Sequence, residues 1–351
     1  MERRKTKAVN VGNIVIGNGN PIAVQTMYNK PLNDNKYEDI LTALRSLSTM
    51  GCKIIRFSYP DSNHKELFKK ICKESPMPVV ADIHFDWKLA IEALKLGADK
   101  IRINPGNIGA KWKVEEVVRA AADYNSCIRI GLNGGSLPRA KKGLDNSTVM
   151  VETALEYLND FEKFNFYNTV VSLKDTSVEN TYKANVELAR AVDYPIHLGV
   201  TEAGGIVSAV ARSTWALGRL LMEGIGDTIR VSITDELHYE ISAAYEILRT
   251  VGVENRGVRV VSCPKCNRST FDSEAFLKEV EMSLLEVEKP LTVAIMGCQV
   301  NGPGEAKQAD IAITGIADKL FLYKKGKLIK EIEPKDAKAE LMKTIEELSN
   351  E

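Results

Sequence analysis

The sequence has no excess of charge of either sign, because its 47 Lys and Arg residues are matched by 47 Asp and Glu residues. A chain without net positive charge has no long-range attraction for nucleic acid or for an anionic membrane. No apolar run approaches the length of a membrane span, and the charged residues 1–7 are followed by no apolar signal core. We therefore expect a cytoplasmic protein that binds neither nucleic acid nor membrane and meets anionic ligands with locally placed cations.

Histidine is also scarce, with four residues in the whole chain and none after His238. Any metal site in the last hundred or so residues must therefore use thiolates or carboxylates. Three of the six cysteines, Cys52, Cys72 and Cys127, lie in apolar helix or strand patterns and are interpreted as reduced core residues. The other three lie near the C-terminus in a different setting.

Between residues 21 and 250, short apolar runs alternate eight times with amphipathic helical stretches. The runs are rich in Val and Ile, as expected of strands that are buried on both faces. The expected strands are residues 22–26, 53–57, 79–83, 100–103, 127–132, 169–173, 196–200 and 228–233. Eight βα units over about 250 residues is the size of a closed (β/α)8 TIM-type barrel. A doubly wound open sheet is the alternative, but no glycine-rich nucleotide-binding sequence favours it.

After Gly252 the pattern changes, and we expect a smaller α+β domain over residues 255–351, which leaves residues 1–254 for the barrel. The expected elements are strands at 259–262, 291–296 and 310–315, a helix at 273–287, a glycine turn at 301–305, a hairpin near Gly326 and a final helix from Pro334.

Polar or charged residues stand at the end of every expected barrel strand, where the active sites of TIM barrels lie. They are Gln25, Thr26, Arg56, Asp82, His84, Asn104, Asn133, Lys174, Thr201, Glu202, Arg230 and Ser232. Arg102 and Arg129 lie within strands, where a charge is costly unless it is paired or faces a ligand. Considered alone, each of these arginines could form a structural ion pair. His84 alone could be a core histidine whose ring nitrogens are hydrogen-bonded.

Taken together, these residues place an excess of positive charge around one mouth. The cations are Arg56, Arg102, Arg129, Lys174 and Arg230. Asp82 and Glu202 are the only obvious counter-charges. A ligand with several negative charges resolves the excess, and a small diphosphate fits because arginine donates two parallel hydrogen bonds to phosphate.

The second domain contains Cys263 and Cys266 in a CxxC pattern, and Cys298 follows a distant strand. Three thiolates suit an iron–sulfur cluster whose remaining iron takes another ligand, for which Glu305 is the nearest candidate. A closed zinc site normally needs four ligands, and this domain offers no fourth cysteine or histidine. A zinc knuckle completed by Glu305, a redox dithiol at the CxxC and inert cysteines remain the alternatives.

Eight segments in the same order carry a resemblance over nearly the whole chain. They are residues 21–27 (PIAVQTM), 81–85 (ADIHF), 101–107 (IRINPGN), 129–137 (RIGLNGGSL), 197–204 (HLGVTEAG), 226–234 (GDTIRVSIT), 262–266 (SCPKC) and 297–305 (GCQVNGPGE). With these segments the sequence resembles the 4-hydroxy-3-methylbut-2-enyl diphosphate synthases, the cluster enzymes of the non-mevalonate isoprenoid pathway. The last segment is specific, whereas CxxC alone is weak.

The resemblance implies a bacterial-type two-domain oxidoreductase and a head-to-tail homodimer. It implies a [4Fe-4S] cluster on Cys263, Cys266, Cys298 and Glu305. The implied substrate is 2-C-methyl-D-erythritol 2,4-cyclodiphosphate, whose ring is opened and from which a hydroxyl is removed by two electrons to give the linear allylic diphosphate. The electron donor, flavodoxin or ferredoxin, is not identified by the sequence.

The resemblance also assigns roles within the barrel. The implied diphosphate ligands are Arg56, Arg102, Arg129, Lys174, Arg230 and Ser232, while Asp82, Asn133 and Glu202 contact the carbon skeleton and its hydroxyls. Asn104 and Thr201, at the ends of the fourth and seventh expected strands, are further candidate substrate contacts. For the proton that accompanies loss of the hydroxyl, Glu202 is the first candidate donor and His84 the second.

Two rival functions follow from the same residues. One is a phosphate-binding barrel enzyme with a structural zinc and no redox step, which the identity of the metal distinguishes. The other is a non-enzymatic zinc-knuckle protein that binds nucleic acid. The balanced charge and the lack of a basic stripe interleaved with aromatic residues argue against this second rival.

Overall fold

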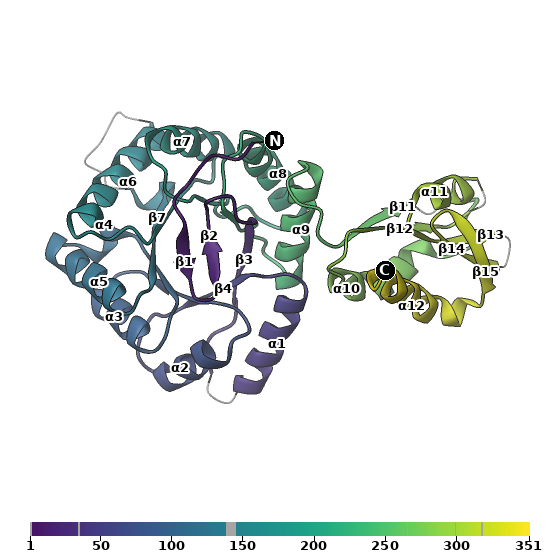
Figure 1. Ribbon diagram of the computed structural model, residues 1–351, viewed down its shortest axis with the longest axis horizontal. Helices are drawn as coiled ribbons and strands as arrows, with labels where there is room; N and C mark the ends of the chain where they lie inside the picture. The colour runs from purple at the N-terminus through teal and green to yellow at the C-terminus, as the bar shows by residue number, and fades with distance from the viewer. Residues whose placement is uncertain (1, 34–35, 138–144, 265, 299, 317–318) are drawn as a thin grey trace. The chain divides into compact units, whose positions relative to one another are not determined.

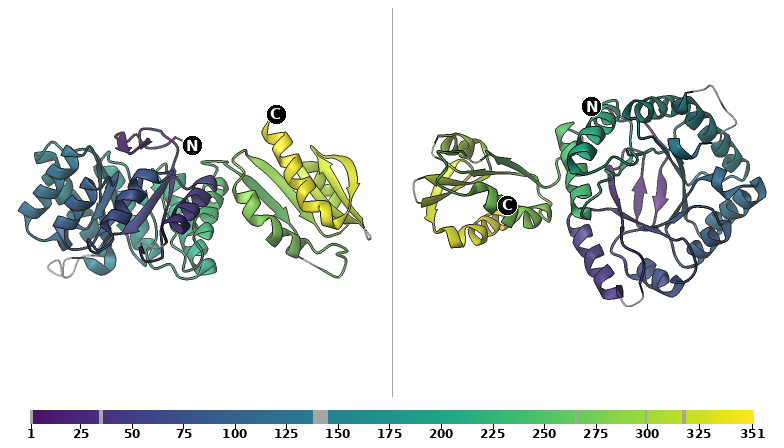
Figure 2. Two further views of the ribbon diagram at one scale, coloured as in Figure 1. Left: turned by 90° about the horizontal axis from the view of Figure 1, so that it is seen from below. Right: turned by 180° about the vertical axis from the view of Figure 1, so that it is seen from behind.

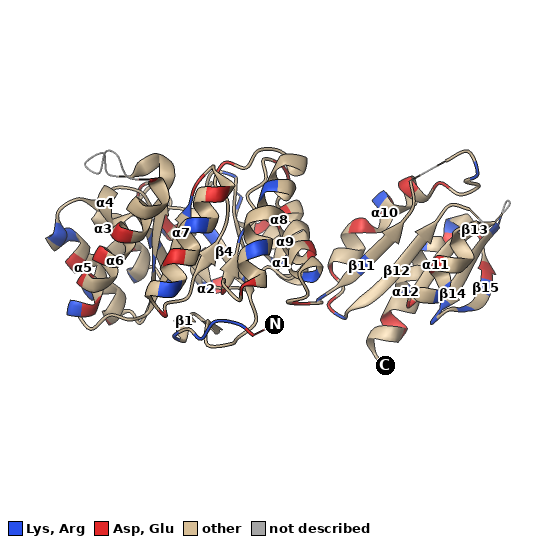
Figure 3. Ribbon diagram, turned by 90° about the horizontal axis from the view of Figure 1, so that it is seen from above, with Lys and Arg blue, Asp and Glu red and all other residues tan. Residues whose placement is uncertain are grey.

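The computed structural model describes all residues except 1, 34–35, 138–144, 265, 299 and 317–318. The chain divides into two compact units, residues Met1–Glu254 and Asn255–Glu351 (Figure 1). Charges of both signs occur on the helices of both units (Figure 3). In the described part of the chain, we find no helix with the length and apolar character needed to cross a membrane.

The first unit is the predicted (β/α)8 barrel, with an outer ring of helices (Figure 1). Its strands are β3 (Ala23–Met27), β4 (Ile54–Ser58), β5 (Val79–Ile83), β6 (Lys100–Ile103), β7 (Cys127–Asn133), β8 (Thr169–Lys174), β9 (His197–Leu198) and β10 (Thr228–Ile229). They pair in parallel in the order β8-β7-β6-β5-β4-β3-β10-β9. A single parallel bridge between Val171 and Ile196 joins the two ends of this order and closes the barrel.

The helices of this unit follow the strands in the expected alternation. They are α1 (Tyr37–Thr49), α2 (Lys65–Glu74), α3 (Trp87–Lys95), α4 (Pro105–Ile108), α5 (Lys111–Asp123), α6 (Asn146–Lys163), α7 (Val178–Ala191), α8 (Ile206–Met222) and α9 (Leu237–Thr250). Side chains cap several of them, as when Asp86 accepts a bond from the backbone N–H of Lys88 and Ser177 accepts one from Asn180. These caps fix where the chain turns from a strand end into a helix.

Strands β9 and β10 are shorter than the sequence predicts, with two residues each instead of five and six. Their flanking backbone groups bond to side chains outside the ladder. The N–H of Ile196 donates to Asp227 Oδ2 at 2.9 Å, and the N–H of Ile233 donates to Glu240 Oε1 at 3.1 Å. Buried carboxylates therefore replace ladder partners at this side of the barrel.

A two-stranded hairpin, which the sequence analysis missed, covers the N-terminal end of the barrel (Figure 2). It consists of β1 (Val9–Val11) and β2 (Ile14–Ile16), and its buried side chains pack against the first inward-facing residues of the strands. That contact is apolar and includes Ala23, Val80 and Cys127. The barrel interior is thus sealed at one end, and its polar residues lie toward the other.

The second unit is a five-stranded sheet with helices on both faces. Its elements are β11 (Val258–Ser262), α10 (Ser273–Leu285), β12 (Leu291–Met296), α11 (Gly302–Gln308), β13 (Ile311–Ile316), β14 (Lys319–Lys324), β15 (Lys327–Ile332) and α12 (Ala337–Ser349). The strands pair in chain order, the first three in parallel and the last two antiparallel. Helices α10 and α12 share one apolar cluster with the sheet, and α11 packs on the opposite side chains of β12 and β13.

The predicted glycine turn at residues 301–305 is wrong, because Gly302 begins helix α11. Pro303 lies in the first turn of this helix, where its missing N–H removes no helical hydrogen bond. Gly302 is packed close to Thr314 of β13, where a Cβ atom would lie 3.1 Å from the threonine side chain. The Gly-Pro-Gly sequence therefore starts a helix that fits tightly against the sheet.

The hairpin that closes the barrel gives a test of the fold. Ile16→Ala removes a fully buried side chain and should lower the free energy of unfolding by about 2–4 kcal/mol. The control is Val15, which lies on the other face of the same strand and is 41% exposed. Val15→Ala should change the free energy of unfolding by less than about 0.5 kcal/mol. Urea unfolding followed by tryptophan fluorescence reports on this unit alone, because Trp87, Trp112 and Trp215 all lie in it. Equal losses in the two variants would show that the hairpin is not part of the core.

Candidate active site

Five basic side chains lie in, or directly after, five different barrel strands. They are Arg56 of β4, Arg102 of β6, Arg129 of β7, Lys174 of β8, and Arg230, which directly follows β10. The sequence analysis placed them around the mouth, but all except Arg230 are buried. The structure therefore gathers the predicted cations inside the barrel, where water does not screen their repulsion.

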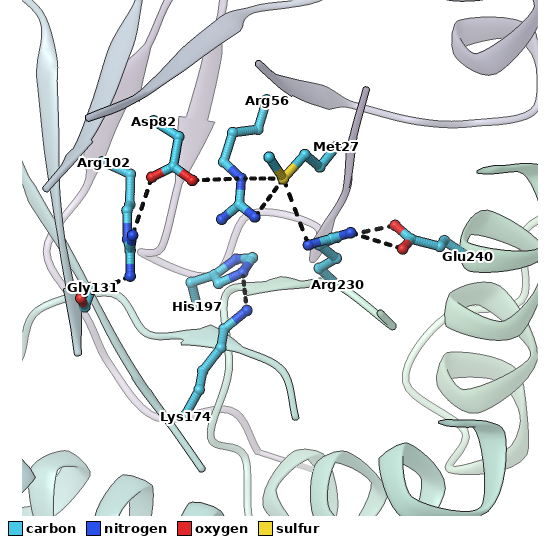
Figure 4. Close-up of polar contacts among 9 residues, drawn as sticks. All are labelled: Met27, Arg56, Asp82, Arg102, Gly131, Lys174, His197, Arg230 and Glu240. Carbon is cyan, nitrogen blue, oxygen red and sulfur yellow. Dashed lines mark hydrogen bonds and ion pairs between the residues drawn. The ribbon is translucent and has the colours of Figure 1, made fainter. Parts of the chain in front are cut away.

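Asp82 of β5 is the counter-charge for two of these cations (Figure 4). Its Oδ1 accepts from Arg102 Nη1 at 3.2 Å, and its Oδ2 lies 3.7 Å from Arg56 Nε. The Nη2 group of Arg102 donates a hydrogen bond to the carbonyl of Gly131 at 3.0 Å. Burial by itself raises the pKa of Asp82, but the nearby charges of Arg56, Arg102 and Arg129 outweigh it and lower the pKa below the usual value. Asp82 is therefore ionised at neutral pH.

Glu240, on helix α9, holds Arg230 and was missed by the sequence analysis (Figure 4). Its two oxygens accept from Arg230 Nε at 3.0 Å and Nη2 at 2.8 Å, a bidentate geometry that fixes the guanidinium plane. Thr26 Oγ1 donates to the same carboxylate at 2.6 Å. A signal was available, because Glu240 lies three residues after Leu237 and one before Ile241, within the apolar stripe of its helix.

Arg129 and Lys174 have no carboxylate partner among the described residues. Arg129 is 1% exposed, and its Nε and Nη1 atoms have no hydrogen-bond partner there. Burial, followed by the charges of Arg56 and Arg102, lowers the pKa of Arg129 well below its usual value. A buried, unsatisfied cation is costly, so this arrangement needs an anion that enters the barrel.

Two glycines, by lacking a Cβ atom, make room for the side chains of Lys174 and Arg102. A Cβ on Gly199 would lie 2.5 Å from Lys174 Nζ, and a Cβ on Gly131 would collide with Arg102 Nε. Any larger residue at either position would push a cation out of place. The sulfur of Met27 fills the gap between two others, 2.8 Å from Arg56 Nη2 and 4.0 Å from Arg230 Nη1 (Figure 4). A thioether is a weak acceptor, so a phosphate oxygen would be the better partner for these arginines.

The remaining predicted residues lie in the loops that follow the strands. Asn104 caps helix α4 and donates to Ser136 Oγ at 3.3 Å, which links the loops after β6 and β7. Asn133 ends β7, half-buried, and is paired in register with Lys174 of β8. The N–H of Thr201 donates to the carbonyl of Asp175 at 3.4 Å. These residues sit at one end of the barrel with the buried cations below them.

Asp82 and the two candidate proton donors, Glu202 and His84, occupy different positions. Asp82 is buried between Arg56 and Arg102, as described above. Glu202 is exposed, and its backbone has a φ of +52°, a conformation that a residue with a side chain rarely adopts. Strain of this kind is often found at functional sites. His84 is exposed directly after β5, with its ring 6.2 Å from that of Phe85, and Ser232 is half-buried just after β10.

The predicted cluster ligands come from neighbouring elements of the second unit. Cys263 follows β11, Cys298 follows β12, and Glu305 lies in the first turn of α11. Because β11 and β12 are parallel neighbours, Cys263 and Cys298 leave the sheet at the same edge. Cys266 is exposed, and a backbone hydrogen bond from Arg268 lowers the pKa of its thiol, which favours the thiolate that binds metal.

These four side chains are not assembled into a metal site. Within the described part of the chain, no three His, Cys, Asp or Glu side chains are grouped closely enough to hold a metal ion. Lys265 and Gln299, which belong to the two cysteine segments, lie outside the described residues. The donor set still fits a cluster, since three free thiols and a carboxylate come from the segments after β11 and β12 and from the first turn of α11. By contrast, burial raises the pKa of Cys52 and Cys127 to about 12, so these thiols stay protonated and inert.

Two family models match the chain. One, described as the GcpE TIM-barrel domain, matches residues 6–245, and the other, described as the GcpE protein C-terminal domain, matches residues 259–347. This chain belongs to the GcpE family.

Curated relatives of high similarity carry the name 4-hydroxy-3-methylbut-2-en-1-yl diphosphate synthase (flavodoxin). The chain is 43% identical to the protein of Symbiobacterium thermophilum, over 100% of this chain and 95% of that one. It is 45% identical to the protein of Maridesulfovibrio salexigens, over 99% and 97% of the two chains. For Caldanaerobacter subterraneus the identity is 44% over 99% of each chain. The predicted membership of this synthase family is confirmed.

Solved structures with a similar fold include dihydropteroate synthases. That of Yersinia pestis matches with a TM-score of 0.50 and 13% identity, over 70% of this chain and 97% of its own. That of Xanthomonas albilineans matches with a TM-score of 0.51 and 12% identity over the same shares. At this identity the likeness concerns the fold alone.

The space that Gly199 leaves for Lys174 provides a test of the cationic interior. Gly199→Ala should weaken binding of inorganic pyrophosphate about 10- to 100-fold, because the added methyl group displaces a charged donor. Gly205→Ala is the matched control, since a Cβ there meets no atom within 4 Å, and it should leave the affinity unchanged. Calorimetric titration of both variants decides the matter. The same affinity in both would mean that Lys174 does not face the anion.

Proposed function

We propose that this protein catalyses the two-electron reductive ring opening and dehydroxylation of 2-C-methyl-D-erythritol 2,4-cyclodiphosphate to 4-hydroxy-3-methylbut-2-enyl diphosphate. Membership of the GcpE family and the names of the curated relatives support the reaction. The structural observation that carries the proposal is Arg129, which is buried among four further cations and has no carboxylate partner in the described part of the chain. This arrangement favours a ligand with several negative charges.

In this proposal the interior cations bind the diphosphate, and each charged hydrogen bond contributes about 1.5–3 kcal/mol. Arg129 and Lys174 lack a carboxylate partner in the described part of the chain, so they are free to bond to phosphate oxygens. Arg56 and Arg230 exchange the weak sulfur acceptor of Met27 for phosphate oxygens. Asp82 and Glu240 keep Arg102 and Arg230 in place, which holds the site ready before the ligand arrives.

The polar residues at the strand ends bind the rest of the substrate. Asn104, Asn133, Thr201 and Ser232 offer hydrogen-bonding groups to the hydroxyls and to the outer phosphate oxygens. The buried floor and the apolar hairpin exclude water from the other end of the barrel. A dry site strengthens every charge interaction inside it.

The residues that would hold the [4Fe-4S] cluster are Cys263, Cys266, Cys298 and Glu305. When bound, such a cluster supplies the two electrons and a Lewis-acidic iron. Among the residues of the chain itself, Glu202 delivers the proton with which the hydroxyl leaves as water, and His84 is the second candidate. Both side chains are exposed at the end of the barrel where the strands finish.

The proposed electron donor is a flavodoxin, because the names of the curated relatives include that word. Ferredoxin remains the alternative donor. The head-to-tail homodimer, the cytoplasmic location and the lack of binding to nucleic acid or membrane stay predictions from the sequence.

The metal content of the purified protein distinguishes the cluster from a zinc knuckle. After anaerobic purification we expect about four iron and four acid-labile sulfide per chain, and Cys298→Ser should lose most of both. Cys72→Ser, in the other unit, is the control and should keep them. One zinc per chain without sulfide, persisting after reconstitution, would contradict the redox mechanism and favour a structural zinc.

The role of Glu202 is tested by separating binding from turnover. Glu202→Gln removes the proton but keeps the shape, so turnover with reduced flavodoxin should fall about 10²–10⁴-fold while the dissociation constant of the cyclodiphosphate changes little. Glu187→Gln, an exposed change on helix α7, should alter neither quantity. If the Glu202 variant turns over at the normal rate, another group donates the proton.

A further inference from the structure

Three buried side chains from neighbouring strands form a hydrogen-bonded chain across the barrel. Lys174 Nζ of β8 lies 3.1 Å from His197 Nε2 of β9, and His197 Nδ1 lies 2.5 Å from Thr228 Oγ1 of β10. Figure 4 shows Lys174 directed at the imidazole ring. His197 and Thr228 are fully buried, so no water competes for these bonds.

The two contacts of the His197 ring are compatible with a neutral imidazole that accepts from Lys174. Lys174 can donate a hydrogen to Nε2 of His197 in either protonation state, and in that arrangement the single ring proton lies on Nδ1, facing Thr228. An imidazolium would instead point an N–H at the lysine. Burial, followed by the charge of Lys174, accordingly lowers the pKa of His197 well below its usual value. His197 is therefore a neutral acceptor.

The surroundings of Lys174 are positive on almost every side. The cations that face it or its histidine are Arg56 of β4, Lys100 and Arg102 of β6, Arg129 of β7 and Arg230 after β10. The interior carboxylates, Asp82 of β5 and Glu240 of α9, are bonded to arginines. Burial and then the charge of Arg129 lower the pKa of Lys174 well below its usual value. Guanidinium groups keep their protons under such conditions, whereas a buried lysine gives one up.

We propose that His197 is a positioning residue that holds Lys174 as an uncharged amine in the empty barrel, and that binding of the diphosphate is coupled to uptake of one proton by Lys174. The inference rests on the proposed function, because the diphosphate supplies the negative charge that makes the ammonium form favourable. His197 Nε2 accepts a hydrogen bond from either form of the lysine, so the chain of hydrogen bonds persists through the change. The empty site thereby avoids a second cation, beside Arg129, that has no carboxylate partner among the described residues.

The sign of the resulting pH dependence follows from linkage. The proton is absent from the free enzyme and present in the complex over the range between the two pKa values of Lys174. Within that range, affinity for the diphosphate falls up to tenfold for each unit by which the pH rises. The ligand contributes no such change, because each phosphorus of the cyclic diphosphate keeps only one strongly acidic oxygen, unlike a phosphate monoester with its second pKa of about 6.

Calorimetry measures the proton directly. The cyclodiphosphate is titrated into anaerobic, oxidised holoenzyme without reductant, at one neutral pH in PIPES and in Tris, whose ionisation enthalpies differ. We expect the enthalpies in the two buffers to differ by the amount for about one proton taken up per chain. Binding without net uptake overturns the inference and leaves the proposed function standing. No binding at all contradicts the proposed function itself.

Variants identify the group that takes the proton. Lys174→Arg keeps a permanent charge, so this variant should bind the cyclodiphosphate without taking up a proton. His197→Gln and Lys100→Met should bind it with the proton uptake unchanged. Lys100 is the necessary control, because it is also buried without a hydrogen-bond partner in the described part of the chain, and burial lowers its pKa to about 8. Uptake that survives in Lys174→Arg, or that is lost in Lys100→Met or His197→Gln, assigns the proton to another group and overturns the inference.

The positioning role of His197 is tested by keeping or removing its acceptor. The amide of His197→Gln offers an oxygen to Lys174, whereas His197→Leu offers none, so the leucine variant should bind the cyclodiphosphate about tenfold more weakly than the glutamine variant. Tryptophan fluorescence confirms that each variant is folded. Equal affinities would show that His197 does not position Lys174.

Discussion

Buried positive charge inside the barrel is the constraint that the rest of this structure accommodates. Moving an ion out of water costs several kcal/mol even after the surrounding protein relaxes. Asp82 offsets part of this cost by bonding to Arg102 and lying close to Arg56, and Glu240 does the same for Arg230 from a helix outside the sheet. Arg129 is left without such a partner among the described residues. A site built in this way favours an anionic ligand, because the ligand would supply the missing charge.

The barrel makes this arrangement stable because its charged and apolar layers are separated along the axis. The hairpin β1–β2 and the first inward-facing residues form an apolar floor, and the cations lie between that floor and the strand ends. Parallel strands hold each cation in a fixed register with its neighbours, as in the pairing of Arg102 with Arg129. The absence of a Cβ atom at Gly131 and Gly199 then leaves room for two long side chains. Affinity for an anion thus depends on small residues as much as on the cations.

The second unit is organised differently. Its candidate ligands lie on segments that follow strand ends and on a short helix, and within the described residues they are not assembled into a metal site. Metal binding commonly brings such ligands together, because the site is often not formed until the metal is bound. The barrel cations are thus held in place by protein carboxylates, whereas the candidate cluster ligands are not grouped in the described part of the chain.

The sequence by itself determined the barrel, because eight Val- and Ile-rich runs separated by amphipathic helices permit few other arrangements. It also identified the five cations and Asp82, because charges within or at the ends of buried strands stand out against an apolar pattern. The short hairpin at residues 9–16 and the helix at Gly302 were missed, because three-residue strands and a Gly-Pro-Gly sequence have no distinctive period. Only the tertiary structure decided which buried side chains pair with one another. Glu240 reaches Arg230 from another element, and His197 meets Lys174 across two strands, because such pairs depend on distances between segments that are far apart in the chain.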